Sequence, residues 1–188
     1  MRNELLELRK QVENCRKCGL WETRKRSVFG EGPETAKVML VGLGPGYYEN
    51  LMGIPFVGAA GKLLDVLLTL AGLARNEVYI TNVVKCYLPH NKATKEELMA
   101  CTPYLDQQIA IIEPTIIIAL GNVATEYLFD KCKLQTLSMY HLHGKLFDAS
   151  SLFLHAKIVP MYHPAAALRT PRLKAVIMND WKNLYCEK

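Results

Sequence analysis

The cysteines are the side chains whose spacing most plainly suggests chemistry. Four of the six form two candidate pairs of metal ligands, Cys15 with Cys18 and Cys86 with Cys101. The first pair is a C-x-x-C turn, the commonest half of a metal site, and four thiolates suit either a structural zinc or an iron–sulfur cluster. The wide second spacing weakens a zinc-ribbon interpretation but does not separate the two metals. The remaining thiols, Cys132 and Cys186, are interpreted as buried or incidental.

A glycine-rich loop is the second feature with chemical potential. Residues 38–41 form a short apolar run typical of a buried parallel strand, and the sequence Gly-Leu-Gly-Pro-Gly follows at 42–46. Glycines let the backbone approach a ligand closely. In an open α/β sheet, ligands bind outside the carboxyl ends of the strands, where this loop would lie. Taken alone, the loop also fits a turn that only connects a strand to a helix.

The elements that would position these residues alternate along the chain. Apolar or β-branched runs predict strands at 38–41, 78–84, 116–120 and 157–161. Helices are predicted at 4–13 and 61–70, after Thr94 and after Gly121, and a final helix, after the segment 162–169, is predicted to reach roughly Tyr185. Thr94 and Glu97 form a capping box at the start of the third helix. The alternation predicts an α/β fold: one three-layer domain over residues 1–188, with a central, mostly parallel sheet flanked by helices.

Composition and charge limit the classes of protein that fit. The chain has 188 residues, half of them apolar, and no apolar run approaches the roughly 20 residues of a membrane span. No signal-peptide core follows the first residues, so we expect a cytoplasmic protein without membrane association. The formal net charge of +5 permits a polyanionic partner without requiring one. Arg24, Lys25 and Arg26 stand in a row, which fits a phosphate-contacting edge and a solvated loop equally well.

In their order and spacing, the motifs resemble those of the family 4, iron–sulfur uracil-DNA glycosylases within the uracil-DNA glycosylase superfamily. The matching segments are Cys15-x-x-Cys18, Gly42-Leu43-Gly44-Pro45-Gly46, Gly53-x-Pro55-Phe56-Val57-Gly58-x-Ala60-Gly61, Thr81-Asn82-Val83-Val84-Lys85-Cys86, Cys101 and His163-Pro164. Each motif alone would be weak, whereas the ordered set is highly specific. The resemblance covers nearly the whole chain.

The resemblance implies a uracil-DNA glycosylase-like fold and an enzyme of base excision repair. Such an enzyme hydrolyses the N-glycosidic bond of a flipped-out uracil and leaves an abasic site. A structural [4Fe–4S] cluster is implied on the paired cysteines, with a structural zinc as the alternative: Cys15, Cys18, Cys86 and Cys101. The implied partner is uracil-containing DNA, double- or single-stranded. A sliding clamp or other repair proteins are further candidates, and a monomer is expected.

The same resemblance assigns substrate-binding roles. Phe56 would stack on the face of the uracil. The Asn82 amide would match the O4 and N3–H edge of uracil, because cytosine presents the reverse pattern of donors and acceptors. The other side of the pocket would be lined by Gly42, Leu43 and Gly44.

Catalytic and DNA-binding roles are implied in the same way. His163 would stabilise the negative charge that develops on uracil O2, and Glu49 would be the acid in the pocket wall near uracil C5. Leu168 would fill the base stack that the uracil vacates, and Arg169 and Arg172 would meet phosphates. Outside the ordered set of motifs, most of these side chains would fit ordinary core, loop or turn positions equally well.

Leu43 departs from the usual first motif of the family, in which an acid stands at this position. The acid is associated with positioning or activating the attacking water, and leucine does neither. Apolar residues at this point also occur in the related family 5 enzymes, which still cleave. Tyr47 and Tyr48 are further departures, because bulky aromatic rings there would narrow or reshape the pocket.

Three functions remain open at this level. The first is an active glycosylase on uracil, with slower turnover or an altered base range. The second is a catalytically weakened protein that binds uracil or damaged DNA. The third is a cluster- or zinc-bearing protein whose loop cradles a nucleotide phosphate, although the loop lacks the lysine and serine or threonine of a P-loop. The ordered motifs favour the first.

Overall fold

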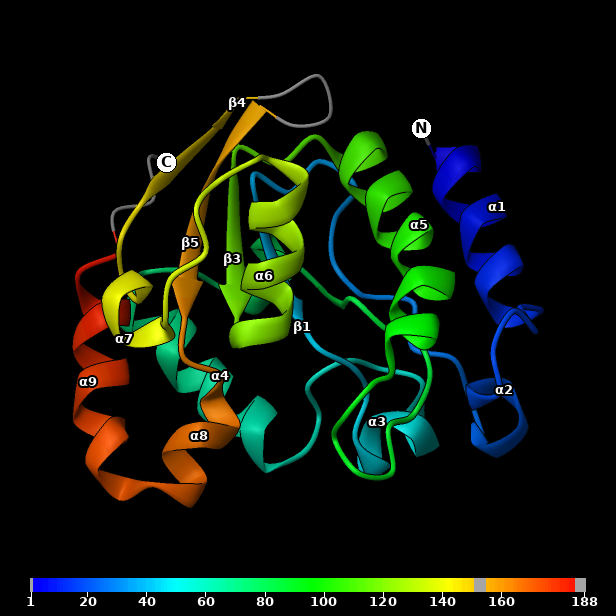
Figure 1. Ribbon diagram of the computed structural model, residues 1–188, viewed down its shortest axis with the longest axis horizontal. Helices are drawn as coiled ribbons and strands as arrows, with labels where there is room; N and C mark the ends of the chain where they lie inside the picture. The colour runs from blue at the N-terminus through cyan, green and yellow to red at the C-terminus, as the bar shows by residue number, and fades with distance from the viewer. Residues whose placement is uncertain (1, 151–154, 185–188) are drawn as a thin grey trace.

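The computed structural model describes residues 2–150 and 155–184 of the chain. Its centre is a five-stranded sheet in the order β2-β1-β3-β5-β4, shown in Figure 1. The strands are β1 (Val38–Gly42), β2 (Tyr79–Asn82), β3 (Ile116–Leu120), β4 (Phe147–Ser150) and β5 (His155–Met161). The strands β2, β1, β3 and β5 are parallel to their neighbours, and β4 pairs antiparallel with β5 at one edge. The predicted mostly parallel sheet is confirmed.

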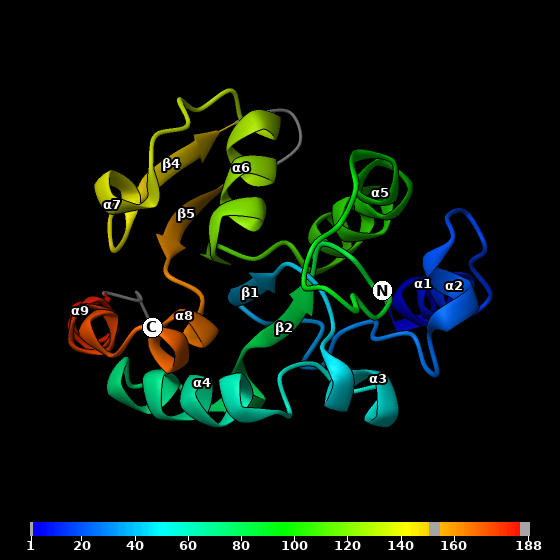
Figure 2. The ribbon, with the colours of Figure 1, turned by 60° about the horizontal axis from the view of Figure 1, so that its bottom comes forward.

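Helices cover both faces of the sheet (Figures 1 and 2). Their bounds are α1 Arg2–Glu13, α2 Leu20–Thr23, α3 Tyr47–Met52, α4 Ala59–Leu70, α5 Lys95–Ile112, α6 Asn122–Lys131, α7 Met139–Leu142, α8 Pro164–Arg169 and α9 Pro171–Lys182. Figure 2 places α5 and α6 over one face and α4, α8 and α9 over the other. None of the helices in the described ranges has the length and apolar character needed to span a membrane.

The two faces of the sheet build two separate cores because alternate strand residues point to opposite sides. Met39 and Val41 of β1 join the core beneath α1, α5 and α6, whereas Val38 and Leu40 join the core that contains residues of α4 and α9. The strands β1 and β3 are buried at every position, as expected for strands covered on both faces. The predicted three-layer arrangement follows from this double burial.

The main differences from the sequence-based prediction lie at element ends and in short elements. The predicted strand 78–84 is shorter, because β2 ends at Asn82 and the chain turns into the cysteine-bearing loop. The predicted final helix corresponds to α9, and the segment before it forms the short helix α8, which meets α9 at Thr170 before Pro171. Its predicted end at Tyr185 lies outside the described residues. The short elements α2, α3, α7 and β4 were not predicted, because segments this short carry little periodicity.

The predicted capping box is confirmed. Thr94 Oγ1 accepts from the Glu97 backbone N–H at 3.2 Å, and Glu97 Oε2 accepts from the Thr94 N–H at 2.7 Å. Pro103 lies inside α5 without ending it, so Cys101 is on a continuous helix.

Candidate active site and cysteine cavity

The proposed pocket residues gather where the parallel strands end. The register of β1 and β2 pairs Gly42 with Asn82, so the last residues of both strands are neighbours. A Cβ atom on Gly42 would lie 2.5 Å from Asn82 Oδ1 and 2.9 Å from Phe56 Cζ. Only glycine at this position leaves room for both side chains, which gives the first glycine of the loop a packing reason.

Phe56 is held by an unusual backbone conformation. Its φ angle is +52°, which a non-glycine residue adopts only when the surrounding structure imposes it. Helix α4 passes so close that a Cβ atom on Gly61 would lie 1.8 Å from the Phe56 carbonyl oxygen. The ring is 6% exposed and stacks on the His163 ring, with the centroids 5.5 Å apart and the planes 26° apart. The two rings therefore come from distant motifs to one site.

Asn82 places an unused amide in this site. The residue is 2% exposed, and its side chain forms no hydrogen bond with any residue in the described part of the chain. Its amide atoms keep contact with solvent, because Trp181 Nε1 is the one fully buried side-chain nitrogen or oxygen atom of the described residues that lacks a partner. An unpaired amide at the mouth of a parallel sheet is therefore typical of a position that a ligand completes.

Glu49 is fixed with one oxygen engaged. Its Oε1 accepts the backbone N–H groups of Val57 and Gly58, both at 2.9 Å. These bonds tie the start of α3 to the turn that carries Phe56. Neither of them uses Oε2, which lies 2.8 Å from the position of a Cβ on Gly46. One carboxylate oxygen is structural, and the other remains for a water or a substrate.

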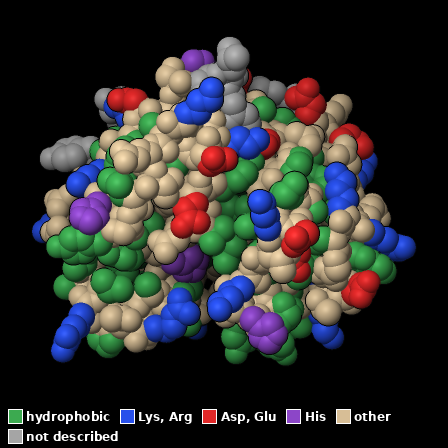
Figure 3. Space-filling view, viewed as in Figure 1, with side chains coloured by type: hydrophobic (Ala, Val, Ile, Leu, Met, Phe, Trp, Pro, Cys, Tyr) green, Lys and Arg blue, Asp and Glu red, His purple; other side chains and the backbone are tan. Residues whose placement is uncertain are grey.

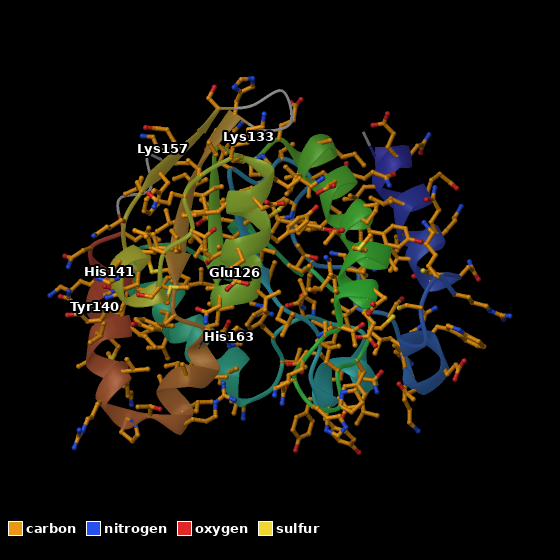
Figure 4. The ribbon with its side chains drawn as sticks, in the orientation of Figure 1. Glu126, Lys133, Tyr140, His141, Lys157 and His163 are labelled. Carbon is orange, nitrogen blue, oxygen red and sulfur yellow. The ribbon has the colours of Figure 1, made fainter. Side chains whose placement is uncertain are left out.

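His163 begins helix α8 directly after β5 (Figure 4). Its Nδ1 accepts the backbone N–H of Ala165 at 3.1 Å. Burial, assisted by the positive charge of Arg169 and opposed by Glu49, lowers the pKa of the imidazole to about 4. At neutral pH the ring is uncharged and Nδ1 is an acceptor, so the proton resides on Nε2 as a hydrogen-bond donor. Gly121 permits this position, since a Cβ there would lie 3.3 Å from His163 Cβ.

A groove of about 670 Å³ opens beside His163. Leu43 and Gly44 form part of one wall, and Leu168 and Arg169 of α8 form part of another. Leu168 is 52% exposed. Arg172 is exposed on α9 just beyond, and Lys and Arg side chains gather along the lower edge of the view in Figure 3. This edge is where the strands point in Figure 1.

The four paired cysteines line a single cavity between α1, the loop after β2 and α5. Cys86 and Cys101 are buried, whereas Cys15 and Cys18 are partly exposed. Burial raises the pKa of the Cys86 thiol and raises that of Cys101 to about 11. Within the described residues, no three His, Cys, Asp or Glu side chains are arranged to hold a single metal ion. Four thiols around one cavity suit either a structural zinc or an iron–sulfur cluster.

Hydrogen-bond donors surround this cavity. The Lys85 backbone N–H donates to Cys101 Sγ at 3.2 Å, and the Arg24 guanidinium donates to Cys86 Sγ at 3.2 Å. Lys17 also lines the cavity. Donors and positive charges of this kind stabilise thiolates, so the residues present fit a thiolate-bound, negatively charged cluster. Cys132 is partly buried and does not line this cavity, whereas Cys186 lies outside the described residues.

Two buried polar side chains escaped the sequence-based prediction. Lys85 is 1% exposed, and its ammonium donates to Thr81 Oγ1, the Asn82 carbonyl and Gln108 Oε1 at 2.8, 2.6 and 2.5 Å. Nothing in the sequence distinguishes it from a surface lysine. Asn50 is also buried, and its Oδ1 accepts the backbone N–H of Lys25 at 2.7 Å, which anchors the basic loop to α3.

Comparison with known proteins agrees with this geometry. The family model described as "Uracil DNA glycosylase superfamily" matches residues 29–184. The chain is 43% identical over 176 residues to the type-4 uracil-DNA glycosylase of Saccharolobus solfataricus, covering 93% of this chain and 82% of that protein. It is 43% identical over 184 residues to the Sulfurisphaera tokodaii type-4 enzyme, covering 97% and 84%.

One relative of lower identity is a glycosylase of another type. The type-5 uracil-DNA glycosylase of Pyrobaculum aerophilum is 30% identical over 176 residues, which cover 86% of this chain and 75% of that protein. Identity is therefore clearly higher to the type-4 proteins. The chain belongs to the type-4 uracil-DNA glycosylases of the uracil-DNA glycosylase superfamily.

Proposed function

We propose that the site at the strand ends of this uracil-DNA glycosylase receives a uracil extruded from DNA and hydrolyses its N-glycosidic bond, leaving an abasic site. The observation that carries the proposal is the Asn82 amide, which is nearly buried and forms no hydrogen bond with the described residues. An amide offers one acceptor and donors, which pair with uracil N3–H and O4. Cytosine has the opposite arrangement and would leave the amide unsatisfied, so the amide selects uracil.

Stacking holds the base in register with this amide. The Phe56 ring lies beside Gly42 and Asn82, and its constrained backbone fixes the ring plane. The stacked position of the His163 ring over Phe56 brings the two catalytic motifs into contact in the free protein. We infer that the uracil inserts at this contact, with Gly44 and Leu43 on the opposite side.

His163 supports departure of the base. When the C1′–N1 bond breaks, its electron pair goes to the uracil, whose negative charge develops on O2, and the sugar gains oxocarbenium character. A neutral imidazole with the proton on Nε2 stabilises that oxygen by donating a hydrogen bond. Because the Ala165 N–H occupies Nδ1, the ring is held in the productive tautomer before the substrate arrives.

Water then completes the hydrolysis. Its oxygen bonds to C1′, one of its protons is released, and the uracil anion is protonated as it leaves. Glu49 Oε2 is the carboxylate oxygen of the site that the backbone hydrogen bonds leave available to orient this water. Leu43 supplies no such group, so the rate is expected to be lower than an acid at that position would give.

The exposed end of α8 meets the DNA. Leu168 is positioned to fill the space that the uracil leaves in the base stack, and Arg169 and Arg172 are positioned to contact phosphates. The exposure of Leu168 in the free protein leaves its side chain available for this contact.

We infer further that Cys15, Cys18, Cys86 and Cys101 bind a [4Fe–4S] cluster that fixes α1 and α5 against the loop following Asn82. The support is the shared cavity and the donors to Cys86 and Cys101. Anaerobically purified protein should contain iron, acid-labile sulfide and visible cluster absorption. Cys101→Ser should lose them, and Cys132→Ser, outside the cavity, should keep them. Stoichiometric zinc without iron in the purified protein would contradict the assignment.

The activity is tested with labelled oligonucleotides that carry uracil opposite guanine, opposite adenine or in a single strand. Enzyme in excess should form abasic sites, and His163→Ala should lose this cleavage by about 10²- to 10³-fold. His141→Ala, an exposed histidine on α7, is the matched control and should cleave normally. Repeating the assay with hypoxanthine tests the base range.

A second function is favoured by one observation, the leucine at position 43. Tight, uracil-dependent binding of DNA without abasic-site formation would identify a damage-binding protein that keeps the pocket and has lost hydrolysis. Neither binding nor cleavage by protein with an intact cluster would contradict both functions.

A further inference from the structure

We propose that Tyr47 and Tyr48 form a stacking platform for an unpaired DNA base next to the extruded uracil, which makes single-stranded DNA a preferred substrate. The two rings open helix α3 and are 59% and 61% exposed. They stand directly before Glu49 in the chain. This inference rests on the proposed function, because the base in question belongs to the strand whose uracil occupies the pocket.

The rings are placed at the rim of the pocket. The Tyr48 ring packs near Gly58, since its Cδ2 lies 3.5 Å from the position of a Cβ on that glycine. Gly58 also donates its backbone N–H to Glu49, so Tyr48 and the catalytic carboxylate share one neighbour. Tyr47 meets Tyr48 edge to face, with the centroids 5.5 Å apart and the planes at 81°. The pair is braced internally while both rings keep exposed surface.

A basic loop is tied to the helix that carries the two rings. Asn50, on the same helix, accepts the backbone N–H of Lys25 and thereby ties the loop 24–26 to α3. The Lys25 and Arg26 side chains on this loop are exposed. Figure 3 shows hydrophobic and basic side chains side by side at the lower edge of the molecule around α3. Aromatic rings next to cations are the combination that binds single-stranded nucleic acid, with bases on the rings and phosphates on the charges.

The apolar surface of α3 continues beyond the two rings. Leu51 and Met52 are 38% and 53% exposed, so both ends of this short helix present apolar side chains to solvent. Such a patch, on the helix that also carries Glu49, fits a nucleobase better than a surface exposed by chance. A base inside a duplex is already stacked on its neighbours and gains less from the platform, which is why the unpaired strand is favoured.

The test uses single-stranded oligonucleotides in which the base 5′ or 3′ of the uracil is replaced by a baseless tetrahydrofuran residue. With the wild-type enzyme, removing the base on one flank should raise KM about tenfold and leave kcat nearly unchanged. The double variant Tyr47→Ala/Tyr48→Ala should show the higher KM with both substrates. Tyr47→Phe/Tyr48→Phe keeps the rings and should behave as wild type.

Tyr140→Ala is the matched control. This tyrosine is 75% exposed on α7, and both ribbon views place α7 on the far side of the molecule from α3. It should retain the full dependence on the flanking base. A wild-type enzyme indifferent to both flanks, or a double alanine variant that keeps the dependence, would overturn the platform.

A binding measurement separates this proposal from the proposed function. An oligonucleotide with 2-aminopurine beside a tetrahydrofuran residue should lose fluorescence when wild-type protein stacks on the reporter base, and should not do so with the double alanine variant. Quenching by a protein that cleaves no uracil would support the platform while the hydrolytic function fails. Normal cleavage without quenching at either flank would reject the platform alone.

Discussion

Two buried polar groups near the end of β2 are treated in opposite ways by the fold. The Lys85 ammonium is surrounded by three acceptors, whereas the Asn82 amide, three residues earlier, has none in the described structure. Both residues are almost fully buried, at 1% and 2% exposed. Burial alone therefore does not distinguish a structural polar group from a functional one. The presence or absence of partners does.

The region around Lys85 is internally complete. Gln108 donates to the Phe29 carbonyl and to the Tyr79 hydroxyl, and the Thr81 hydroxyl also donates to Phe29. Burial lowers the pKa of the Lys85 ammonium to about 7. The Asn82 amide has no such partners among the described residues, and Glu49 Oε2 takes no part in the hydrogen bonds to Val57 and Gly58. A network in which every polar group has a hydrogen-bond partner stabilises the fold, whereas polar groups without partners are available to bind a ligand.

The largest effect is expected for Asn82→Ala. The variant removes a group that has no described partner in the free protein, so the melting temperature should stay the same or rise. Excision of uracil should fall by about a hundredfold or more, because the substrate edge loses its matching amide. Single-turnover cleavage and thermal unfolding measure the two effects, with Asn76→Ala, an exposed asparagine, as the control. A strongly destabilised variant would mean that the amide is structural.

Lys85→Met should show the opposite behaviour. It removes the ammonium and leaves Gln108 and the Asn82 carbonyl without their donor, which should lower the free energy of unfolding by about 2–4 kcal/mol. Urea unfolding at neutral pH measures this loss. Lys62→Met, on the exposed face of α4, should change stability by less than about 0.5 kcal/mol. Equal free energies of unfolding for Lys85→Met and Lys62→Met would show that the hydrogen bonds of Lys85 do not stabilise the fold, and the contrast with Asn82 would be lost.

Sequence could predict the frame and most of the pocket for a physical reason. The strands are short, continuous apolar runs, which is the pattern expected for strands that are buried on both faces of a parallel sheet. Gly42 and Asn82 are the last residues of β1 and β2, and His163 comes two residues after β5 ends, so predicting the strands also predicts that these residues lie at one edge of the sheet. The order of the motifs then supplied the roles.

What sequence could not supply depends on contacts between distant segments. Lys85 has the sequence context of a surface residue, because its burial depends on Gln108, which lies on the distant helix α5. The left-handed backbone of Phe56 follows from the approach of α4 at Gly61 rather than from any local preference. The tautomer of His163 depends on a cap that forms only when α8 begins at Pro164. Each of these is a tertiary consequence that no local pattern encodes.

One nitrogen of the His163 ring has a partner within the protein, and the other is left for a ligand. The lowered pKa of this ring predicts an effect of pH on the free energy of unfolding that is intermediate in size. Its pKa is lowered from 6.5 to about 4 in the folded protein, so the unfolded chain binds a proton more readily between these values. Its contribution to stability is fully present above about pH 6.5 and is lost as the pH falls towards 4. Between neutral pH and about pH 5 the loss should be about 2 kcal/mol.

This pH effect is measured as a difference between variants. Urea unfolding at both pH values should show a smaller loss for His163→Ala than for wild type, whereas His141→Ala should lose as much as wild type. Identical pH dependence in His163→Ala and wild type would show that the imidazole is not held neutral by the fold. In that case, the hydrogen bond from the Ala165 N–H to His163 Nδ1, which the variant lacks, would contribute nothing to the loss of stability at low pH.

Leu43 offers the smallest and most discriminating test of the open pocket. The leucine is partly buried, lines the groove beside Gly44 and brings no polar atom to a site in which other groups await partners. Leu43→Glu should raise single-turnover excision of uracil by about tenfold, because a carboxylate there can orient or deprotonate the attacking water. Leu43→Gln has nearly the same shape without the charge and should give little gain. An equal gain from both variants would assign the effect to polarity alone, and no gain from glutamate would mean that Glu49 already supplies the carboxylate that hydrolysis needs.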